Sequence, residues 1–178
     1  MAVIPPFNLT QWIDENRHLL QPPVGNKNIY ADSGDYIVMI VAGPNARKDY
    51  HYNETEELFY QLEGSIKVII QDEGQRKEMI LNAGDIYLHP AKTPHSPVRS
   101  ANSIGLVIER KRAGKGFTDG LLWFCDNCNH KLHEVYFELH DIEKDFLPHF
   151  QHYYNSPDLR TCSKCGTIMD TDPRFTSK

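Results

Sequence analysis

Apolar residues at the start of the chain follow a helical period. They recur every three or four positions between residues 8 and 20, which predicts an amphipathic helix over that stretch. Asn8 is a favourable first cap, and Gln11, three positions later, completes a capping-box pattern. Pro22 and Pro23 end the predicted helix, because proline lacks the backbone donor that the next turn needs.

From about residue 30 to residue 110 the pattern changes to short runs rich in β-branched and aromatic residues. Glycine, proline and asparagine separate the runs, for example at residues 43–45 and 82–85. Since no helical pattern intervenes, we expect consecutive strands to pair antiparallel in a sandwich or barrel, an all-β fold class. The predicted strands are residues 36–42, 57–62, 66–71, 78–81, 86–89 and 104–109.

Residues 112–120 are rich in glycine and charge and are typical of a linker. Two cysteine pairs lie beyond this segment and bracket a stretch rich in His, Asp and Phe. We therefore predict a first domain over residues 1–120, with the N-terminal helix and the linker, and a metal-stapled C-terminal extension over residues 121–178.

Composition excludes several classes of function. The 178 residues carry a formal net charge of −5 and no Lys/Arg block, so nothing indicates a nucleic-acid partner. The apolar runs are too short to span a bilayer, so no membrane partner is expected. The N-terminus lacks a basic region followed by a long apolar one, so we expect no signal peptide and a cytoplasmic location.

Four cysteines form two CxxC pairs, Cys125 with Cys128 and Cys162 with Cys165. In a reducing compartment this spacing favours one tetrahedral metal site over disulfides, and both zinc and iron fit four thiolates. A closed site without an open coordination position favours a structural role over electron transfer or redox sensing. A nucleic-acid-binding zinc ribbon is a further alternative, against which the acidic residues 141, 143 and 145 argue.

A second group of possible metal ligands lies in the β-patterned region. His51, Glu57 and His95 stand at the ends or starts of predicted strands. Two imidazoles and one carboxylate leave adjacent positions open on an octahedral metal, which suits non-haem Fe(II) better than a closed structural zinc site. Each histidine alone is more often an ordinary core or surface residue, so the prediction rests on the three residues together.

Arginines accompany both histidine segments. Arg47 lies four residues before His51, and Arg99 lies four residues after His95, so both can project into one cavity. A guanidinium group matches a carboxylate in a two-pronged hydrogen bond, which indicates an anionic ligand. Glu109 ends the apolar run 104–108 and is equally compatible with a buried role and with exposure to solvent.

These residues fit the two motifs of the cupin superfamily. The first motif runs from Gly43 through His51 to Glu57 and Gly64, and the second has the form G(x)5P(x)4H over residues 84–95. The chain departs from the first motif at Asn53, which replaces the usual second histidine, and from the second motif at Lys92 and Arg99. The resemblance implies a double-stranded β-helix, a jelly-roll-like barrel, with the three ligands inside it.

Longer strings resemble 3-hydroxyanthranilate 3,4-dioxygenases over nearly the whole chain, the CxxC pairs included. They are GPNxRxDYH (43–51), EELFYQL (56–62), GDIYLHP (84–90), HSPVR (95–99) and VIERKR (107–112). The resemblance implies that His51, Glu57 and His95 hold Fe(II). It also implies substrate contacts from Arg47, Arg99 and Glu109, with proton handling by Glu109, a ring pocket, and an O₂ site near Arg47 and Asp49. The implied ring-pocket residues are Phe59, Pro97, Val24 and Asn26.

The reaction implied is cleavage of the ring of 3-hydroxyanthranilate by O₂ to give 2-amino-3-carboxymuconate semialdehyde. The product would enter quinolinate and NAD synthesis through the kynurenine pathway, or the breakdown of an aromatic carbon source. The resemblance also suggests a homodimer, and iron or zinc at the four cysteines. Two alternatives stay open: a cupin oxygenase of a related aminophenol or thiol, and a non-catalytic cupin that binds a small ligand.

Overall fold

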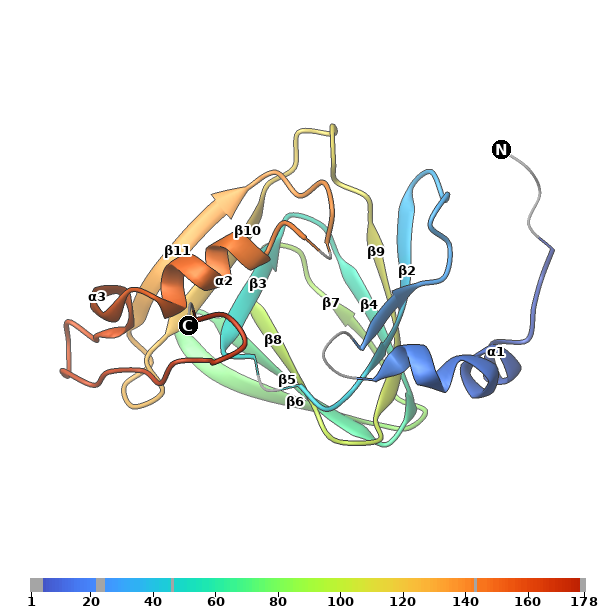
Figure 1. Cartoon of the computed structure of the whole chain (residues 1–178), viewed down its shortest axis with the longest axis horizontal. Coiled ribbons are helices and arrows are strands. Elements are labelled where there is room, and N and C mark those ends of the chain that lie inside the picture. Colours follow the sequence, from blue (N-terminus) through green and yellow to red (C-terminus); the bar gives the residue numbers. More distant parts are fainter. Residues whose placement is uncertain (1–4, 22–24, 46, 143, 177–178) are drawn as a thin grey trace.

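The computed structural model describes residues 5–21, 25–45, 47–142 and 144–176, and its strands form two antiparallel sheets that face each other (Figure 1). One sheet has five strands in the order β1-β2-β9-β4-β7, and the other has six in the order β11-β10-β3-β8-β5-β6. This architecture confirms the predicted cupin barrel. The strands are β1 (Asn26–Asn28), β2 (Tyr36–Ala42), β3 (Asp49–Asn53), β4 (Glu57–Glu63), β5 (Ser65–Asp72), β6 (Gln75–Asn82), β7 (Ile86–His89), β8 (His95–Arg99), β9 (Ile104–Arg110), β10 (Asp119–Phe124) and β11 (Lys131–Phe137).

The predicted N-terminal helix is present as α1 (Leu9–Asn16), followed by the 3₁₀ turn η1 (Arg17–Leu20). Asn8 caps α1 as expected, because its side chain accepts a hydrogen bond from the Gln11 backbone N–H at 2.9 Å. The second half of the predicted capping box is wrong. The Gln11 side chain donates forward to Glu15 at 2.8 Å and so stabilises the next turn instead. The predicted helix stop at residues 22–23 lies outside the described residues.

Alternation along the strands sorts the barrel interior into three levels. In the first sheet, β4 and β9 pair their buried residues as Glu57 with Glu109, Phe59 with Val107, and Gln61 with Gly105. In the second sheet, β8 contributes His95, Pro97 and Arg99 in the same order, and His95 lies opposite His51 of β3. The interior therefore has an upper level of polar ligands, an apolar middle level, and a second polar, lower level.

The C-terminal part packs against the second sheet. Strand β10 pairs with β3 on one side and β11 on the other, and helices α2 (Leu147–Tyr154) and α3 (Pro157–Arg160) lie over this region (Figure 1). Their contact is an aromatic cluster that includes Trp123, Phe150 and Tyr153. The predicted boundary between residues 120 and 121 falls inside β10, and the division into two domains remains a prediction.

None of the helices in the described part of the chain is long and apolar enough to cross a bilayer.

Candidate active site

The predicted ligands His51, Glu57 and His95 lie together at the upper level of the barrel. Their ligand atoms all lie within 4.8 Å of one another, and all three side chains are buried. His51 and His95 face each other across β3 and β8, and His95 Nε2 lies 3.2 Å from Glu57 Oε2. Two imidazoles and a carboxylate converging from three strands are a donor set that fits a divalent transition metal.

A buried carboxylate orients His51. Asp119, at the start of β10, lies 2.8 Å from His51 Nε2, and a carboxylate partner of this kind fixes the orientation of the ring. Arg112 in turn donates to both Asp119 oxygens and, through Nη1, to Glu109 at 2.7 Å. A continuous polar network therefore joins a metal ligand to the carboxylate predicted to handle protons.

Sequence reasoning missed Asp119 and Arg112, because both fall in the segment interpreted as a linker. The side chains of both residues are 0% exposed. Charged residues among glycines are typical of solvated loops, and the ion pairs that bury these two reach across the fold to β3 and β9. The signal for a buried role was the VIERKR string, of which Arg112 is the last residue.

The environment shifts the pKa values of two of the ligands, Glu57 and His51, in the direction that favours a bound cation. Burial opposes ionisation of Glu57, but the charge and hydrogen bond of His95 outweigh it and hold the pKa of Glu57 at about 2. Burial lowers the pKa of His51, although its hydrogen bond to Asp119 acts in the opposite direction. An ionised Glu57 and a neutral His51 are the protonation states in which these two side chains bind a cation.

Glu109 is buried at the upper level, 2% exposed, which decides between the two readings that the sequence left open. Burial and the charge of Glu57 raise the pKa of Glu109 to about 7, against the opposing effect of Arg112. A carboxyl group with a pKa near neutrality can both accept and donate a proton at working pH.

The two predicted arginines have different partners. Arg99 is 3% exposed, and within the described residues its Nε and Nη1 have no hydrogen-bond partner. Burial lowers the pKa of Arg99 to about 10. Arg47 instead forms a two-pronged ion pair with Asp49, which includes a 3.0 Å bond from Nε, and its guanidinium carbon lies 5.2 Å from the Phe150 ring centroid. Arg99 is therefore the arginine that is available to an incoming anion.

Both arginines and the three ligands line one cavity of about 650 Å³. Most of the other residues predicted to touch a substrate line it as well: Asn26, Phe59, Pro97 and Glu109. Val24 lies outside the described residues. Asp49 is absent from the described lining and reaches the cavity only through Arg47.

The C-terminal segment forms one wall of this cavity, which the sequence did not indicate. Its lining side chains there are mostly apolar: Ile142, Phe146, Leu147, Phe150, Arg174 and Phe175. Phe146 and Phe150 of this wall lie 5.5 Å and 5.2 Å from the Arg47 guanidinium carbon, and the Phe146 ring centroid lies 5.2 Å from that of His51. A cavity with polar groups at its upper and lower levels and apolar side chains between them suits a small aromatic anion.

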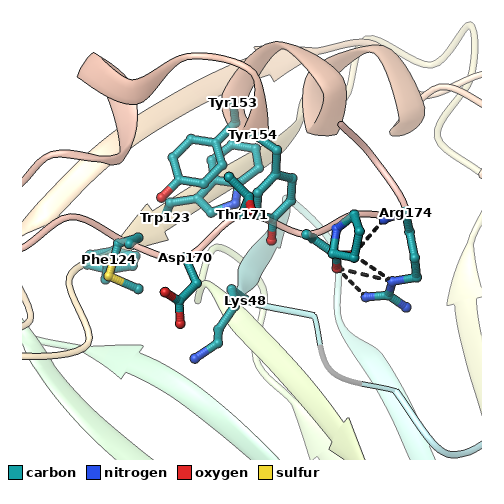
Figure 2. Close-up of a pocket in the computed structure, with 11 residues that line it drawn as sticks. Lys48, Trp123, Phe124, Tyr153, Tyr154, Asp170, Thr171 and Arg174 are labelled. Atoms are coloured by element: carbon teal, nitrogen blue, oxygen red, sulfur yellow. Dashed lines mark hydrogen bonds and ion pairs between the residues drawn. The ribbon is translucent and has the colours of Figure 1, made fainter. Parts of the chain in front are cut away.

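A smaller cavity of about 330 Å³ lies between β10 and the C-terminal segment (Figure 2). Trp123 and Tyr153 stack there with ring centroids 4.3 Å apart. Arg174, held by hydrogen bonds to Asp172, lines both cavities, so it forms part of the partition between them.

The four cysteines also come together as predicted, with their sulfur atoms within 4.8 Å of one another. Each CxxC pair is folded into a tight turn, in which the N–H of Asn129 or Gly166 bonds back to the first cysteine carbonyl. Both residues have positive φ, as such a turn requires. The sulfur set fits a tetrahedral metal.

Comparison with known proteins agrees with this geometry. The model of the 3-hydroxyanthranilic acid dioxygenase family matches residues 1–154. A 3-hydroxyanthranilate 3,4-dioxygenase of Xanthomonas campestris pv. campestris (strain 8004) is 52% identical over 173 residues, covering 97% of each chain. One of Bacillus thuringiensis (strain Al Hakam) is 47% identical, covering 92% of this chain and 90% of the other.

Among solved structures, a cupin-2 domain protein from Shewanella frigidimarina is similar over 55% of this chain and 91% of that chain, with 21% identity and a TM-score of 0.46. The family model and the two relatives confirm the resemblance that the sequence motifs indicated. The chain belongs to the 3-hydroxyanthranilic acid dioxygenase family.

Proposed function

We propose that this protein is an Fe(II)-dependent dioxygenase that opens the ring of 3-hydroxyanthranilate with O₂. The observation that carries the substrate is Arg99, a buried cation with unpartnered donors in the same cavity as the His/Glu/His triad. A buried, unpaired guanidinium is costly, and a carboxylate ligand would offset that cost. The donor set supports iron, because a facial two-histidine, one-carboxylate site leaves adjacent positions for a chelating substrate and O₂.

When bound, iron would supply the electron path between an electron-rich ring and O₂. The residues of the chain would supply position and proton transfer. Arg99 binds the carboxylate at the lower level, and Phe59, Pro97 and Val107 contact the ring at the middle level. Glu109 at the upper level faces the hydroxyl and amino substituents, where it takes and returns a proton.

Arg47 has a smaller role than Arg99 in binding the carboxylate. Its pairing with Asp49 leaves it fewer free donors, so it would guide the carboxylate and border the O₂ position rather than carry most of the binding. Asp49 would act on the O₂ site indirectly, by fixing Arg47. The product proposed is 2-amino-3-carboxymuconate semialdehyde, on the kynurenine pathway towards quinolinate and NAD.

An aerobic assay of the Fe(II)-loaded protein tests the proposal, with 3-hydroxyanthranilate and 2-aminophenol as substrates. Arg99→Ala should lower kcat/KM for 3-hydroxyanthranilate by a factor that corresponds to about 2–5 kcal/mol of lost transition-state binding, the usual loss for a truncated buried charge pair. It should affect 2-aminophenol, which lacks the carboxylate, far less. Arg47→Ala should cost less than Arg99→Ala.

Equal losses with both substrates would contradict the carboxylate contact and favour an oxygenase of another aminophenol. Tight binding of 3-hydroxyanthranilate without O₂ uptake would favour a non-catalytic cupin. Metal analysis of the purified protein identifies the ion at each site. We propose Fe(II) at the triad and a structural iron or zinc at the four cysteines.

We also propose a cytoplasmic homodimer. The outer face of the first sheet carries adjacent apolar side chains on β4 and the edge strand β7, with exposed Tyr60 opposite exposed Ile86 and half-buried Leu58 opposite exposed Leu88. Such a patch supports a two-fold interface between copies. Light scattering should show Ile86→Lys as a monomer, whereas Ile168→Lys, at a similarly exposed site near the cysteines, should stay dimeric. Cell fractionation tests the location.

A further inference from the structure

The lower level of the barrel is built around Arg99. Glycines flank this side chain at two points: a Cβ at Gly43 would lie 3.0 Å from Arg99 Cβ, and a Cβ at Gly105 would lie 3.0 Å from Arg99 Nη1. The guanidinium thus occupies space that is open because β9 has no side chain at position 105. This slot fixes the direction from which Arg99 enters the cavity.

Gln61 occupies the other side of the same slot. It is 1% exposed, and its Nε2 donates to the Glu63 carbonyl at 2.7 Å, which fixes the orientation of the amide. The opposite atom, Oε1, would lie 2.9 Å from a Cβ at Gly105 and has no hydrogen-bond partner among the described residues. A buried acceptor, Gln61 Oε1, and a buried donor, Arg99 Nη1, therefore both border the space beside Gly105, and neither has a hydrogen-bond partner among the described residues.

Neither Gln61 nor Gly105 is among the described residues that line the catalytic cavity, whereas Arg99 is. Gln61 thus lies behind Arg99 as seen from the cavity. Leaving a donor and an acceptor both unpaired in the interior costs free energy, and bringing them together relieves it. An amide oxygen can hold the guanidinium from behind without neutralising its charge.

We propose that Gln61 is a positioning residue for Arg99. Its amide oxygen accepts a hydrogen bond from Arg99 Nη1 across the space that Gly105 leaves open, so Gly105 determines specificity by lacking a side chain. The remaining N–H groups of Arg99 then face the carboxylate of the substrate. This inference rests on the proposed function, because it deepens the role of Arg99 in binding an aromatic carboxylate. A side chain at position 105 would separate the two groups and push the guanidinium towards the ring position.

Equilibrium binding tests the proposal without turnover. Isothermal titration of the protein with anthranilate, which keeps the carboxylate, should show that Gln61→Leu weakens binding by about tenfold to a hundredfold. Gly105→Ala should have a similar effect. Gln61→Glu should weaken binding further, because an internal carboxylate would compete for Arg99. All three variants should keep the KM for 2-aminophenol within about threefold of wild type, because this substrate has no carboxylate for Arg99 to bind.

Gln71→Leu is the matched control, because Gln71 is also a buried strand glutamine but its amide pairs with Asn129. It should leave anthranilate binding unchanged. If the Gln61 and Gly105 variants lose anthranilate and 2-aminophenol equally, or bind anthranilate as wild type does, the positioning role is wrong. If Gln61→Leu fails to fold, anthranilate binding by Gln61→Glu and Gly105→Ala tests the positioning role instead. If wild type itself shows no preference for the carboxylate substrate, the proposed function fails instead.

Discussion

Asp119 is not among the described residues that line the catalytic cavity, but its carboxylate contacts the predicted metal ligand His51. It holds one nitrogen of His51 and is itself held by Arg112. Outer partners of this kind typically change metal affinity by about 10–100-fold. They do so by fixing the tautomer and the orientation of the ring.

We therefore expect Asp119→Asn to weaken metal binding at the triad by about 10–100-fold. Competition with a metal chelator measures the affinity directly. Asp49→Asn is a suitable control, since Asp49 is equally buried but pairs with Arg47. Unchanged affinity in Asp119→Asn would show that His51 needs no such support.

Glu109 gives a prediction for pH. Its pKa is raised to about 7, chiefly by burial, so the ionised base form grows as the pH rises through neutrality. We expect kcat/KM for 3-hydroxyanthranilate to rise with pH on a limb near 7. Glu109→Gln should be slow and should lack this limb. A limb that persists in Glu109→Gln belongs to another group.

At the scale of elements, α2 forms both part of the C-terminal aromatic cluster and part of the cavity wall. Phe150 is 6% exposed and stacks beside Arg47. Phe150→Ala should lower the free energy of unfolding by about 3–5 kcal/mol and raise KM, because the cluster and the wall lose the same ring. Chemical denaturation and steady-state kinetics measure the two effects.

The control for this prediction is Leu147→Ala on the same helix. Leu147 is 44% exposed, so its removal should cost the fold little. A normal KM in a destabilised Phe150→Ala variant would limit the role of the ring to packing.

Apolar alternation predicted some strands and missed others. The segments that became β4, β5 and β9 were predicted because they are rich in β-branched, aromatic and other apolar residues. Strands β3 (DYHYN) and β8 (HSPVR) were not, because their inward positions carry metal ligands and an arginine rather than apolar groups. Site residues thus hid the strand pattern at β3 and β8 but not at β4, which holds Glu57 within an otherwise apolar and aromatic run. Motif spacing identified the ligands on all three strands.

Long-range contacts account for the rest of the site. The spacing of His51, Glu57 and His95 is visible in the sequence, whereas the ion pairs of Asp119 and the cavity wall from α2 depend on how β10 joins β3. No local pattern encodes that pairing. The motifs therefore predicted the ligands better than they predicted what surrounds them.

At the scale of the whole molecule, the cysteine site fastens the C-terminal segment that walls the cavity. Cys125→Ser should release the metal there and lower the melting temperature, because a structural metal contributes folding free energy. The Cys125→Ser variant that is folded and loaded with iron should still cleave 3-hydroxyanthranilate. Calorimetry, metal analysis and the ring-cleavage assay on the same sample test this, with Ser163→Ala as a control inside the second CxxC pair. A stable, iron-loaded but inactive variant would assign the cysteines a catalytic role.

Strand β10 links the His/Glu/His triad to the cysteine cluster by a fixed number of residues. Asp119 opens the strand beside His51, and Cys125 follows its last residue. Because side chains alternate between faces, deleting or inserting a single residue in β10 would turn Asp119 away from His51 or carry Cys125 out of the sulfur cluster. The strand thus acts as a ruler of fixed length between the two sites, and only the loops on either side can take up an inserted or deleted residue without changing either cluster.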